Sequence, residues 1–401
     1  MSSRPQRSLV AVLGALALVI GACSAPPTAE DGTTTTGEPA TTAAPGTTAA
    51  EEETTTTEAT GEGNNLAALE DVYAEVEGLT GEERTARLLE LAQEEDTLSI
   101  YGSTNLEDAL PLFDAFADLY DLEPNYYRAS SSDVLQRILQ EVDANFPGNG
   151  VVMANGPEMA ILDGEGLLLP LETPTTDNII EAGVFPTWAA IYMNSFIAGW
   201  NTEFVSGEVP DNWNDFLTTF EGALAIEVGD WDWFATLTRR YFIEELGMTE
   251  DEVVELFKTA VAGAKVVDGH TLMAELLVAG EYDASTSLYH HRVTELMSEG
   301  APLEWEPPVR PIIVRPNGVG IMSHVQNPAS ALLWVEFMLT DGQVLLADEF
   351  RGPASTEVEG GIPVEYAPIL VDLEAITQER EKWEALWEEI VLAAGTEPIE
   401  E

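Results

Sequence analysis

The sequence of 401 residues contains one cysteine, and it has few cations, with 16 Lys and Arg against 72 Asp and Glu. A single cysteine excludes an intramolecular disulfide, a thiolate metal cluster and a CxxC redox pair. The formal net charge of −56 opposes binding to phosphate backbones, so we expect no nucleic acid partner. The hydrophobic content of 45% is ordinary for a globular protein, so the charge does not indicate overall disorder.

The sequence also lacks the short motifs of several enzyme classes. It contains no GxSxG elbow, no Gly-Lys phosphate loop and no HExxH pair. Carboxylates are so numerous that a pair suited to glycoside hydrolysis could be found almost anywhere, and their number therefore carries no information. We predict a protein that is not an enzyme and has no cofactor. A secreted hydrolase is the alternative.

The first residues have the three parts of an export signal. Arg4 and Arg7 precede an apolar run over 9–20, which is shorter than a membrane-spanning helix. Small residues then lead to Cys23, an arrangement that resembles the bacterial lipoprotein cleavage box. We predict a lipoprotein signal peptide over 1–22 and lipid attachment at Cys23, which would hold the protein at the extracellular face of the cell membrane. An ordinary signal peptide with an incidental cysteine is the alternative.

Two segments precede the main body of the chain. Residues 23–63 are rich in Thr, Ala, Glu, Gly and Pro and have few large apolar side chains, which predicts a disordered tether. A flexible segment of this length reaches about 35 Å root-mean-square. Residues 64–96 have apolar positions at the helical period, which predicts an N-terminal helical extension with a packing role.

The body begins with a strand, a polar turn and a helix, and this unit occurs three times. Strand-like runs at 97–101, 124–127 and 151–154 each end in a polar turn that precedes a helical pattern. Such alternation predicts a parallel sheet with right-handed crossovers. Ligands bind beyond the carboxyl ends of such strands, where these turns lie.

A second alternation begins near residue 224, and two long extended stretches at 189–199 and 310–322 are candidates for hinge connections between lobes. The predicted fold is therefore α/β, with two lobes and two hinge crossings. The predicted limits are 97–195 for the first part of lobe 1, 196–314 for lobe 2, and 315–401 for the return to lobe 1 with a C-terminal helical tail.

Several phrases of the body carry a family resemblance. They are LSIYGSTNLEDALPLFDAFADLY from residue 98, EGLLLPL at 165–171, GAPLEWEPP at 300–308, RPNGVGIM at 315–322 and NPASALLWVEFMLTDGQ at 327–343. Over roughly 97–358 the chain resembles the extracellular solute-binding proteins of ABC importers, in the branch that includes the ferric-ion-binding proteins. The resemblance implies a type II periplasmic-binding-protein clamp that works as a monomer and delivers a ligand to an ABC permease and its ATPase. A ligand-sensing surface receptor is an alternative.

The resemblance also bears on the ligand. In the ferric-binding branch it implies iron held by a His in the first turn, a Glu in the third turn and two adjacent tyrosines in the second lobe. Here the first and third turns carry Asn105 and Asn155, and the tyrosine pair is replaced by Tyr289 and His290. This donor set is softer than Fe³⁺ prefers. An anionic or polar organic solute is therefore the preferred ligand, and Fe³⁺ as a transported ligand, held by Tyr289 and His290, is the alternative.

The candidate ligand-binding residues lie in the polar turns of both lobes. They are Ser103, Thr104, Asn105, Arg128, Ser131, Ser132, Asn155, Gly156, Asp230, Trp231, Tyr289 and His290. Helix N-termini are natural anion sites, and Arg128 suits a phosphate or carboxylate beside one. Capping of helices is the alternative role of the serines. His270 and His324 have no partner in the sequence and are expected to be structural.

Overall fold

The structure of the protein, a computed structural model, describes residues 65–146 and 148–400. The predicted signal peptide, the lipid attachment at Cys23 and the tether lie outside these residues. The described part begins with two helices, α1 (Leu66–Glu75) and α2 (Gly81–Ala92). Both pack against the long apolar helix α11 (Pro328–Met338), because their buried residues, Leu69, Val72 and Leu88 among them, recur at helical spacing.

One sheet runs through the described residues, with the strand order β2-β1-β3-β9-β4-β7-β5-β6. Its strands on this path are β1 (Ser99–Gly102), β2 (Asn125–Arg128), β3 (Val151–Asn155), β4 (Trp188–Asn201), β5 (Leu224–Glu227), β6 (Lys265–Val267), β7 (Ala284–Tyr289) and β9 (Ile313–Ile321). Three short strands pair beside the path, namely β8 (Leu303–Glu304), β10 (Gly352–Pro353) and β11 (Ile369–Leu370).

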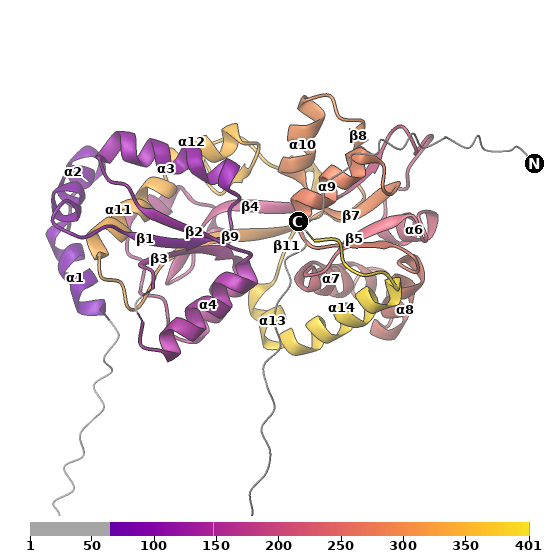
Figure 1. Cartoon of the computed structure of the whole chain (residues 1–401), viewed down its shortest axis with the longest axis horizontal. Coiled ribbons are helices and arrows are strands. Elements are labelled where there is room, and N and C mark those ends of the chain that lie inside the picture. Colours follow the sequence, from indigo (N-terminus) through magenta and orange to yellow (C-terminus); the bar gives the residue numbers. More distant parts are fainter. Residues whose placement is uncertain (1–64, 147, 401) are drawn as a thin grey trace, which may run out of the picture. The chain divides into compact units, whose positions relative to one another are not determined.

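The predicted strand–turn–helix order is confirmed in the first half of the sheet, which is β1, β2 and β3. These strands pair in parallel, and each is followed by a helix, α3 (Leu106–Tyr120), α4 (Ser131–Asp143) or α5 (Gly156–Gly164). Figure 1 shows α3 and α4 on opposite sides of these strands. The carboxyl ends of the three strands therefore meet at one sheet edge, as the sequence predicts.

The second half of the sheet, β5, β6 and β7, is also parallel. Its helices are α6 (Trp213–Thr219), α7 (Trp231–Leu237), α8 (Glu250–Ala260), α9 (His270–Ala279) and α10 (His290–Ser298). A π-helical turn (Thr238–Ile243) continues α7, and 3₁₀ turns lie at Pro174–Asn178, Glu181–Gly183 and Val364–Tyr366. The helices α7, α9 and α10 start directly beyond β5, β6 and β7, so this half also gathers helix N-termini at one edge.

The two long strands β4 and β9 join the halves (Figure 1). They pair with each other in antiparallel orientation, while β9 also pairs with β3 and β4 also pairs with β7. Every residue of both strands is buried. The predicted extended stretches at 189–199 and 310–322 thus fall on β4 and β9, and their role as hinges and the lobe limits stay predictions.

The C-terminal segment spans both halves of the sheet. After α12 (Asp341–Asp348), the short strand β11 pairs with β9, and α13 (Leu373–Gln378) contacts α5 of the first half. The last helix, α14 (Arg380–Ala394), packs against α7 and α8 of the second half, and Ile399 pairs beside β6. The tail therefore makes a third connection between the halves.

Among the described helices, no single one combines the length and hydropathy of a membrane span. The bent pair α11 and α12 reaches both values together. Every residue of α11 is buried in the protein, which is typical of a core helix.

Candidate ligand-binding cleft

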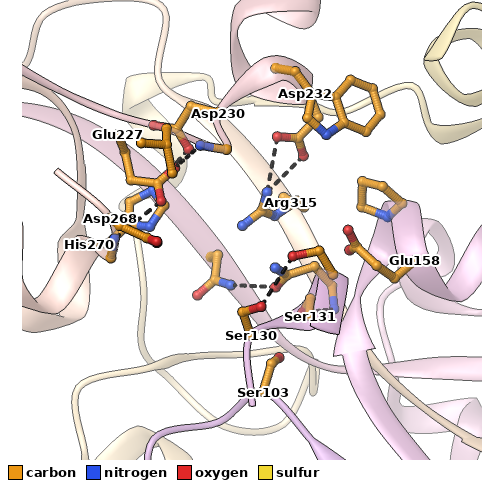
Figure 2. A pocket seen from close by; sticks show the side chains of 18 of the residues that line it. Ser103, Ser130, Ser131, Glu158, Glu227, Asp230, Asp232, Asp268, His270 and Arg315 are labelled. Atoms are coloured by element: carbon orange, nitrogen blue, oxygen red, sulfur yellow. Dashed lines mark hydrogen bonds and ion pairs between the residues drawn. The ribbon is translucent and has the colours of Figure 1, made fainter. Parts of the chain in front are cut away.

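A cavity of about 630 Å³ lies at the carboxyl ends of the strands, and residues of both halves of the sheet line it. Figure 2 shows Glu227, Asp230 and His270 on one side, Ser130, Ser131 and Glu158 on the other, and Arg315 between them. The predicted residues that line the cavity are Ser103, Asn105, Arg128, Ser131, Ser132, Asn155, Asp230, Trp231 and Tyr289. The structure therefore brings polar turns from both predicted lobes to one site.

Three of the candidate residues do not line the cavity. Thr104 is buried, and its hydroxyl lies 3.2 Å from that of Tyr192. Gly156 starts α5, where an added Cβ would lie 3.0 Å from Leu373 and Pro316, so it serves close packing. His290 faces away, 3.3 Å from the hydroxyl of Thr294, with its ring edge-on to Trp305.

The neighbouring His291 lines the cavity instead of His290. Successive residues of a helix point about 100° apart, so a difference of one position in α10 exchanges the residue that faces the cavity. Burial lowers the pKa of His290 to about 4. It also lowers the pKa of His291, whose cationic neighbours, first of all Arg351, act in the same direction.

The turn that contains Ser130, Ser131 and Ser132 both caps α4 and lines the cavity. The side chain of Ser130 accepts a hydrogen bond from the backbone N–H of Asp133 at 3.2 Å, so the cap is Ser130, which is outside the predicted set. The hydroxyl of Ser131 accepts from the backbone N–H of Asn155 at 3.0 Å. Asn155 in turn accepts from the side chain of Asn317 at 3.1 Å. These bonds fix the second and third turns relative to β9.

Arg128 lines the cavity and contacts the first turn. Its Nη2 donates to Oδ1 of Asn105 at 2.5 Å, and Nδ2 of Asn105 donates to the hydroxyl of Thr271 on α9 at 2.9 Å. The first turn of one half of the sheet therefore already contacts a helix of the other half.

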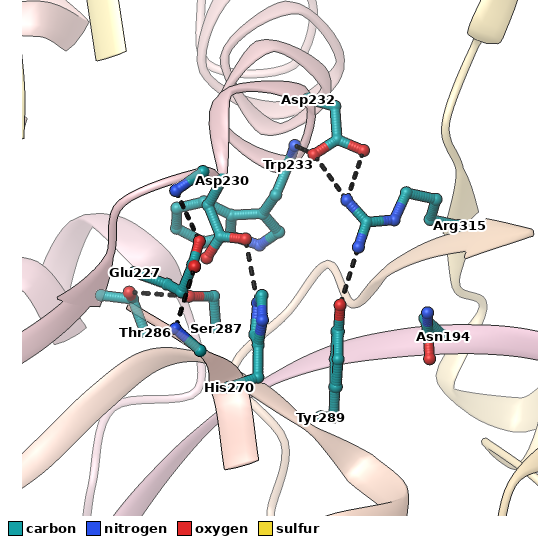
Figure 3. A network of polar contacts seen from close by, with 12 residues as sticks. Asn194, Glu227, Asp230, Asp232, Trp233, His270, Thr286, Ser287, Tyr289 and Arg315 are labelled. Atoms are coloured by element: carbon teal, nitrogen blue, oxygen red, sulfur yellow. Dashed lines mark hydrogen bonds and ion pairs between the residues drawn. The ribbon is translucent and has the colours of Figure 1, made fainter. Parts of the chain in front are cut away.

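Arg315 is the central cation of the cavity, although it is not among the residues predicted from the sequence. It sits inside the apolar strand β9, and its side chain is only 6% exposed. Its Nη1 donates to both carboxylate oxygens of Asp232 at 3.0 and 2.9 Å, and Nη2 donates to the phenolic oxygen of Tyr289 at 2.8 Å (Figure 3). Burial opposes the charge of Arg315, but the attractions of Asp232, Tyr289 and Glu158 together outweigh it and raise the arginine pKa.

His270 also belongs to the cavity lining, and the expectation that it is merely structural is corrected. Its Nε2 lies 3.0 Å from Oδ1 of Asp230. Its ring stacks on that of Tyr289, with the ring centroids 3.9 Å apart and an angle of 6° between the ring planes. Burial favours the neutral ring, but the charge of Asp230 and the hydrogen bond to it, with a contribution from Glu227, raise the pKa of His270. No signal in the sequence joins His270 to Asp230, which is 40 residues away.

Besides Asp230 and Asp232, two buried glutamates line the cavity, Glu158 and Glu227. Burial raises the pKa of Glu158 to about 7, although the charge of Arg315 opposes the rise. Burial also raises the pKa of Glu227, with His270 opposing and Asp230 supporting the shift. The oxygens of Glu227 accept backbone N–H groups of Gly229 at 2.6 Å and of Gly269 at 3.2 Å, which ties β5 to the loop before α9.

Four arginines line the cavity, and three of them have a carboxylate partner. Arg315 binds Asp232, Arg351 binds Asp108, and Arg380 binds Glu384 at 2.6 Å. Among the lining arginines in the described ranges, Arg128 alone has an uncharged partner, the amide of Asn105. It is therefore the lining cation whose charge is left for a ligand.

Some buried polar atoms of the lining have no hydrogen-bond partner within the described residues. They are Oδ2 of Asp230, Oδ1 of Asn194 and Nε of Arg315. Buried polar groups are almost always hydrogen-bonded in folded proteins. These atoms are consequently the donors and acceptors that a bound ligand would engage.

Comparison with solved structures identifies the fold of the chain. No protein-family model and no curated protein sequence matches the chain. The solved structure of AfuA from Actinobacillus pleuropneumoniae, a periplasmic binding protein with fructose-6-phosphate bound, matches with 21% identity and a TM-score of 0.64, over 74% of this chain and 98% of that chain. The chain has the fold of the periplasmic substrate-binding proteins.

Two other structures of this fold carry different ligands. Iron-bound HitA from Pseudomonas aeruginosa is 15% identical with a TM-score of 0.64, over 73% of this chain and 99% of that chain. The periplasmic binding protein MotA from A. tumefaciens B6, in complex with glucopine, is 14% identical with a TM-score of 0.61, over 74% and 99% of the two chains. The predicted two-lobed α/β clamp is thus confirmed, and these similar proteins are binding proteins rather than enzymes.

Proposed function

We propose that the protein is an extracellular solute-binding protein that captures a polar organic solute bearing an anionic group. The observation that carries this proposal is Arg128, a lining cation without a carboxylate partner. It lies beside turns that precede three helices, where Ser103, Ser131 and Asn155 also face the cavity. Guanidinium, hydroxyl and backbone N–H groups are the donors that a carboxylate or phosphate accepts.

The surroundings of Tyr289 weigh against ferric ion as the ligand. Tight binding of Fe³⁺ by tyrosine uses the ionised phenolate, a hard oxygen donor. Burial raises the pKa of Tyr289, with the charge of Arg315 opposing the rise. The phenolic oxygen also accepts a hydrogen bond from Arg315 at 2.8 Å, and this cation would repel iron. His290, the second member of the pair, faces away from the cavity.

Ligand binding would close the clamp. The two halves of the sheet are joined by β4 and β9, which we propose as the hinges between a first lobe, 97–195 with the return after 315, and a second lobe, 196–314. A solute that contacts Arg128 on one side and the Asp230 and Tyr289 region on the other favours the closed state by its differential affinity. With Cys23 as a lipid anchor, the closed protein would deliver this solute, as a monomer, to an ABC permease and its ATPase.

Native mass spectrometry of protein purified from its own host tests the ligand class. We expect one organic anion per chain, and small-angle scattering before and after its removal should show a smaller radius in the bound form. A preparation that carries one iron per chain, or an unchanged radius at saturation, would overturn the proposal. Chemical conversion of the bound solute by the protein would favour the hydrolase instead.

A further inference from the structure

Three side chains on one wall of the cavity are arranged as metal ligands. Glu227 ends β5, Asp230 precedes α7, and His270 starts α9, so adjacent parallel strands bring them together. One potential ligand atom from each lies within 4.8 Å of the others. Figure 3 shows the side chains of Glu227, Asp230 and His270 converging on one another. The proposed function assigns the anionic group of the solute to Arg128 and not to these three side chains.

Asp230 is the member of the cluster with an unsatisfied buried oxygen. The residue is 0% exposed, and its Oδ1 is 3.0 Å from Nε2 of His270. Its Oδ2 has no hydrogen-bond partner among the described residues. A buried carboxylate oxygen without a donor is unfavourable, so this atom needs a proton donor or a cation from outside the chain.

The other two side chains are held in place by neighbours. Each oxygen of Glu227 accepts one backbone N–H, from Gly229 or Gly269, which leaves further lone pairs on both oxygens. The ring of His270 is fixed by its stacking on Tyr289. Such outer contacts orient metal ligands and are typical of metal centres.

We propose that Glu227, Asp230 and His270 form a site for a divalent transition metal, Zn²⁺ in particular. One imidazole nitrogen and two carboxylates suit Zn²⁺, whereas Ca²⁺ takes about six to eight oxygen ligands. The positive end of α9 and the charge of Arg315 act against a cation at His270. The helix end is equivalent to about half a charge and Arg315 is paired with Asp232, so the two carboxylates outweigh them.

The site leaves a coordination position open. All three ligands line the cavity, so a fourth position of a tetrahedral metal faces the cleft. An oxygen of the captured solute can occupy it, a step that rests on the proposed function. Metal binding by itself does not rest on that function, and the ligands are not the positions at which the resemblance to ferric-binding proteins places iron.

Calorimetric titration of the full chain with Zn²⁺ tests the site. The chain carries no polyhistidine tag, is first treated with a chelator, and is kept in millimolar Mg²⁺ to occupy exposed carboxylates. We expect one Zn²⁺ per chain, with affinity lowered at least about tenfold in Asp230→Asn and in His270→Gln. Titration with Co²⁺ should give visible absorption of a four-coordinate ion, which both substitutions abolish.

Asp268→Asn is the matched control, because Asp268 lines the same cavity outside the cluster. Its Zn²⁺ affinity should equal that of the unchanged protein. Circular dichroism melting without metal shows that each variant is folded before titration. Absence of stoichiometric Zn²⁺ binding would overturn the metal site. So would a Zn²⁺ affinity in Asp230→Asn and His270→Gln that equals that of the unchanged protein. That outcome would not affect the proposed capture of a solute, which small-angle scattering tests separately.

Discussion

Arg315 on β9 donates to both carboxylate oxygens of Asp232 on α7, at 3.0 and 2.9 Å. The two side chains are 6% and 1% exposed, so the pair is buried, and it ties a strand that joins the halves of the sheet to a helix of the second half. Paired charges can be buried because each compensates the lost hydration of the other. The same guanidinium orients Tyr289, so one residue organises the centre of the cavity.

Removal of one partner of this pair should be costly. Asp232→Ala leaves the Arg315 guanidinium buried without a counter-charge, and we expect a loss of about 3–5 kcal/mol in the free energy of unfolding, measured by urea denaturation. Asp211→Ala is the control, because the Asp211–Arg310 pair is 58% and 55% exposed and should contribute less than about 1 kcal/mol. Similar losses in both variants would contradict the assigned role of the buried pair.

Glu158 should make stability depend on pH. Its pKa is about 7 in the folded protein and near 4.5 in the unfolded chain, so between these values the folded state holds a proton that the unfolded state has lost. The contribution of Glu158 to stability therefore falls as pH rises through this range. The stability of Glu158→Gln relative to the unchanged protein should increase from pH 5 to pH 8, by up to about 3 kcal/mol.

Chemical denaturation at the two pH values measures this difference. The exposed Glu165 supplies the control, and Glu165→Gln should alter stability by less than about 0.5 kcal/mol at either pH. A relative stability of Glu158→Gln that does not change with pH would show that the folded and unfolded states bind the same number of protons at Glu158.

Arg128 should govern affinity for the anionic solute. Arg128→Gln keeps a hydrogen-bond donor but removes the charge, and hydrogen bonds to charged groups contribute about 1.5–3 kcal/mol. We expect calorimetry with the solute recovered from the host protein to show an affinity lower by about tenfold or more. Arg240→Gln, which changes an exposed pair with Glu244, should bind as the unchanged protein does. Equal affinity in both variants would remove Arg128 from the site.

Trp387 should anchor the C-terminal tail. It is 2% exposed, its ring centroid lies 5.4 Å from that of Phe234, and its Nε1 donates to the carbonyl of Glu227 at 3.2 Å. Trp387→Ala should lower the free energy of unfolding by about 3–5 kcal/mol in urea denaturation. Leu392→Ala on the same helix, where the leucine is 71% exposed, should change it by less than about 0.5 kcal/mol. A comparable loss in both would mean that α14 is not docked through Trp387.

Cys23 should carry the lipid anchor. Cys23→Ala removes the only thiol of the chain, so metabolic labelling with a radioactive fatty acid should disappear from the protein. The variant should also be released from the membrane fraction. Continued membrane retention would show that another part of the chain holds it there.

The sequence predicted the framework of the site because that framework is local. Strand, turn and helix follow one another within about thirty residues in a βαβ unit, and the parallel order then places the turns at one edge. Which residue of a turn caps the helix or faces the cavity was harder to predict from the sequence. The cap of α4 is Ser130, which is outside the predicted set. His291 instead of His290 lines the cavity, since a shift of one residue in a helix changes the direction of a side chain by about 100°.

Composition, the alternation of strands and helices and the positions of the polar turns were determined by the sequence alone, since each depends on neighbours along the chain, and the export signal stays a prediction. The tertiary structure decided the pairing of charges. Arg315 and Asp232 are 83 residues apart, and His270 meets Asp230 from an adjacent strand end. With 72 carboxylates in the chain, no local pattern selects the one that reaches a given cation, because sheet order and burial bring distant residues together and exclude water around them.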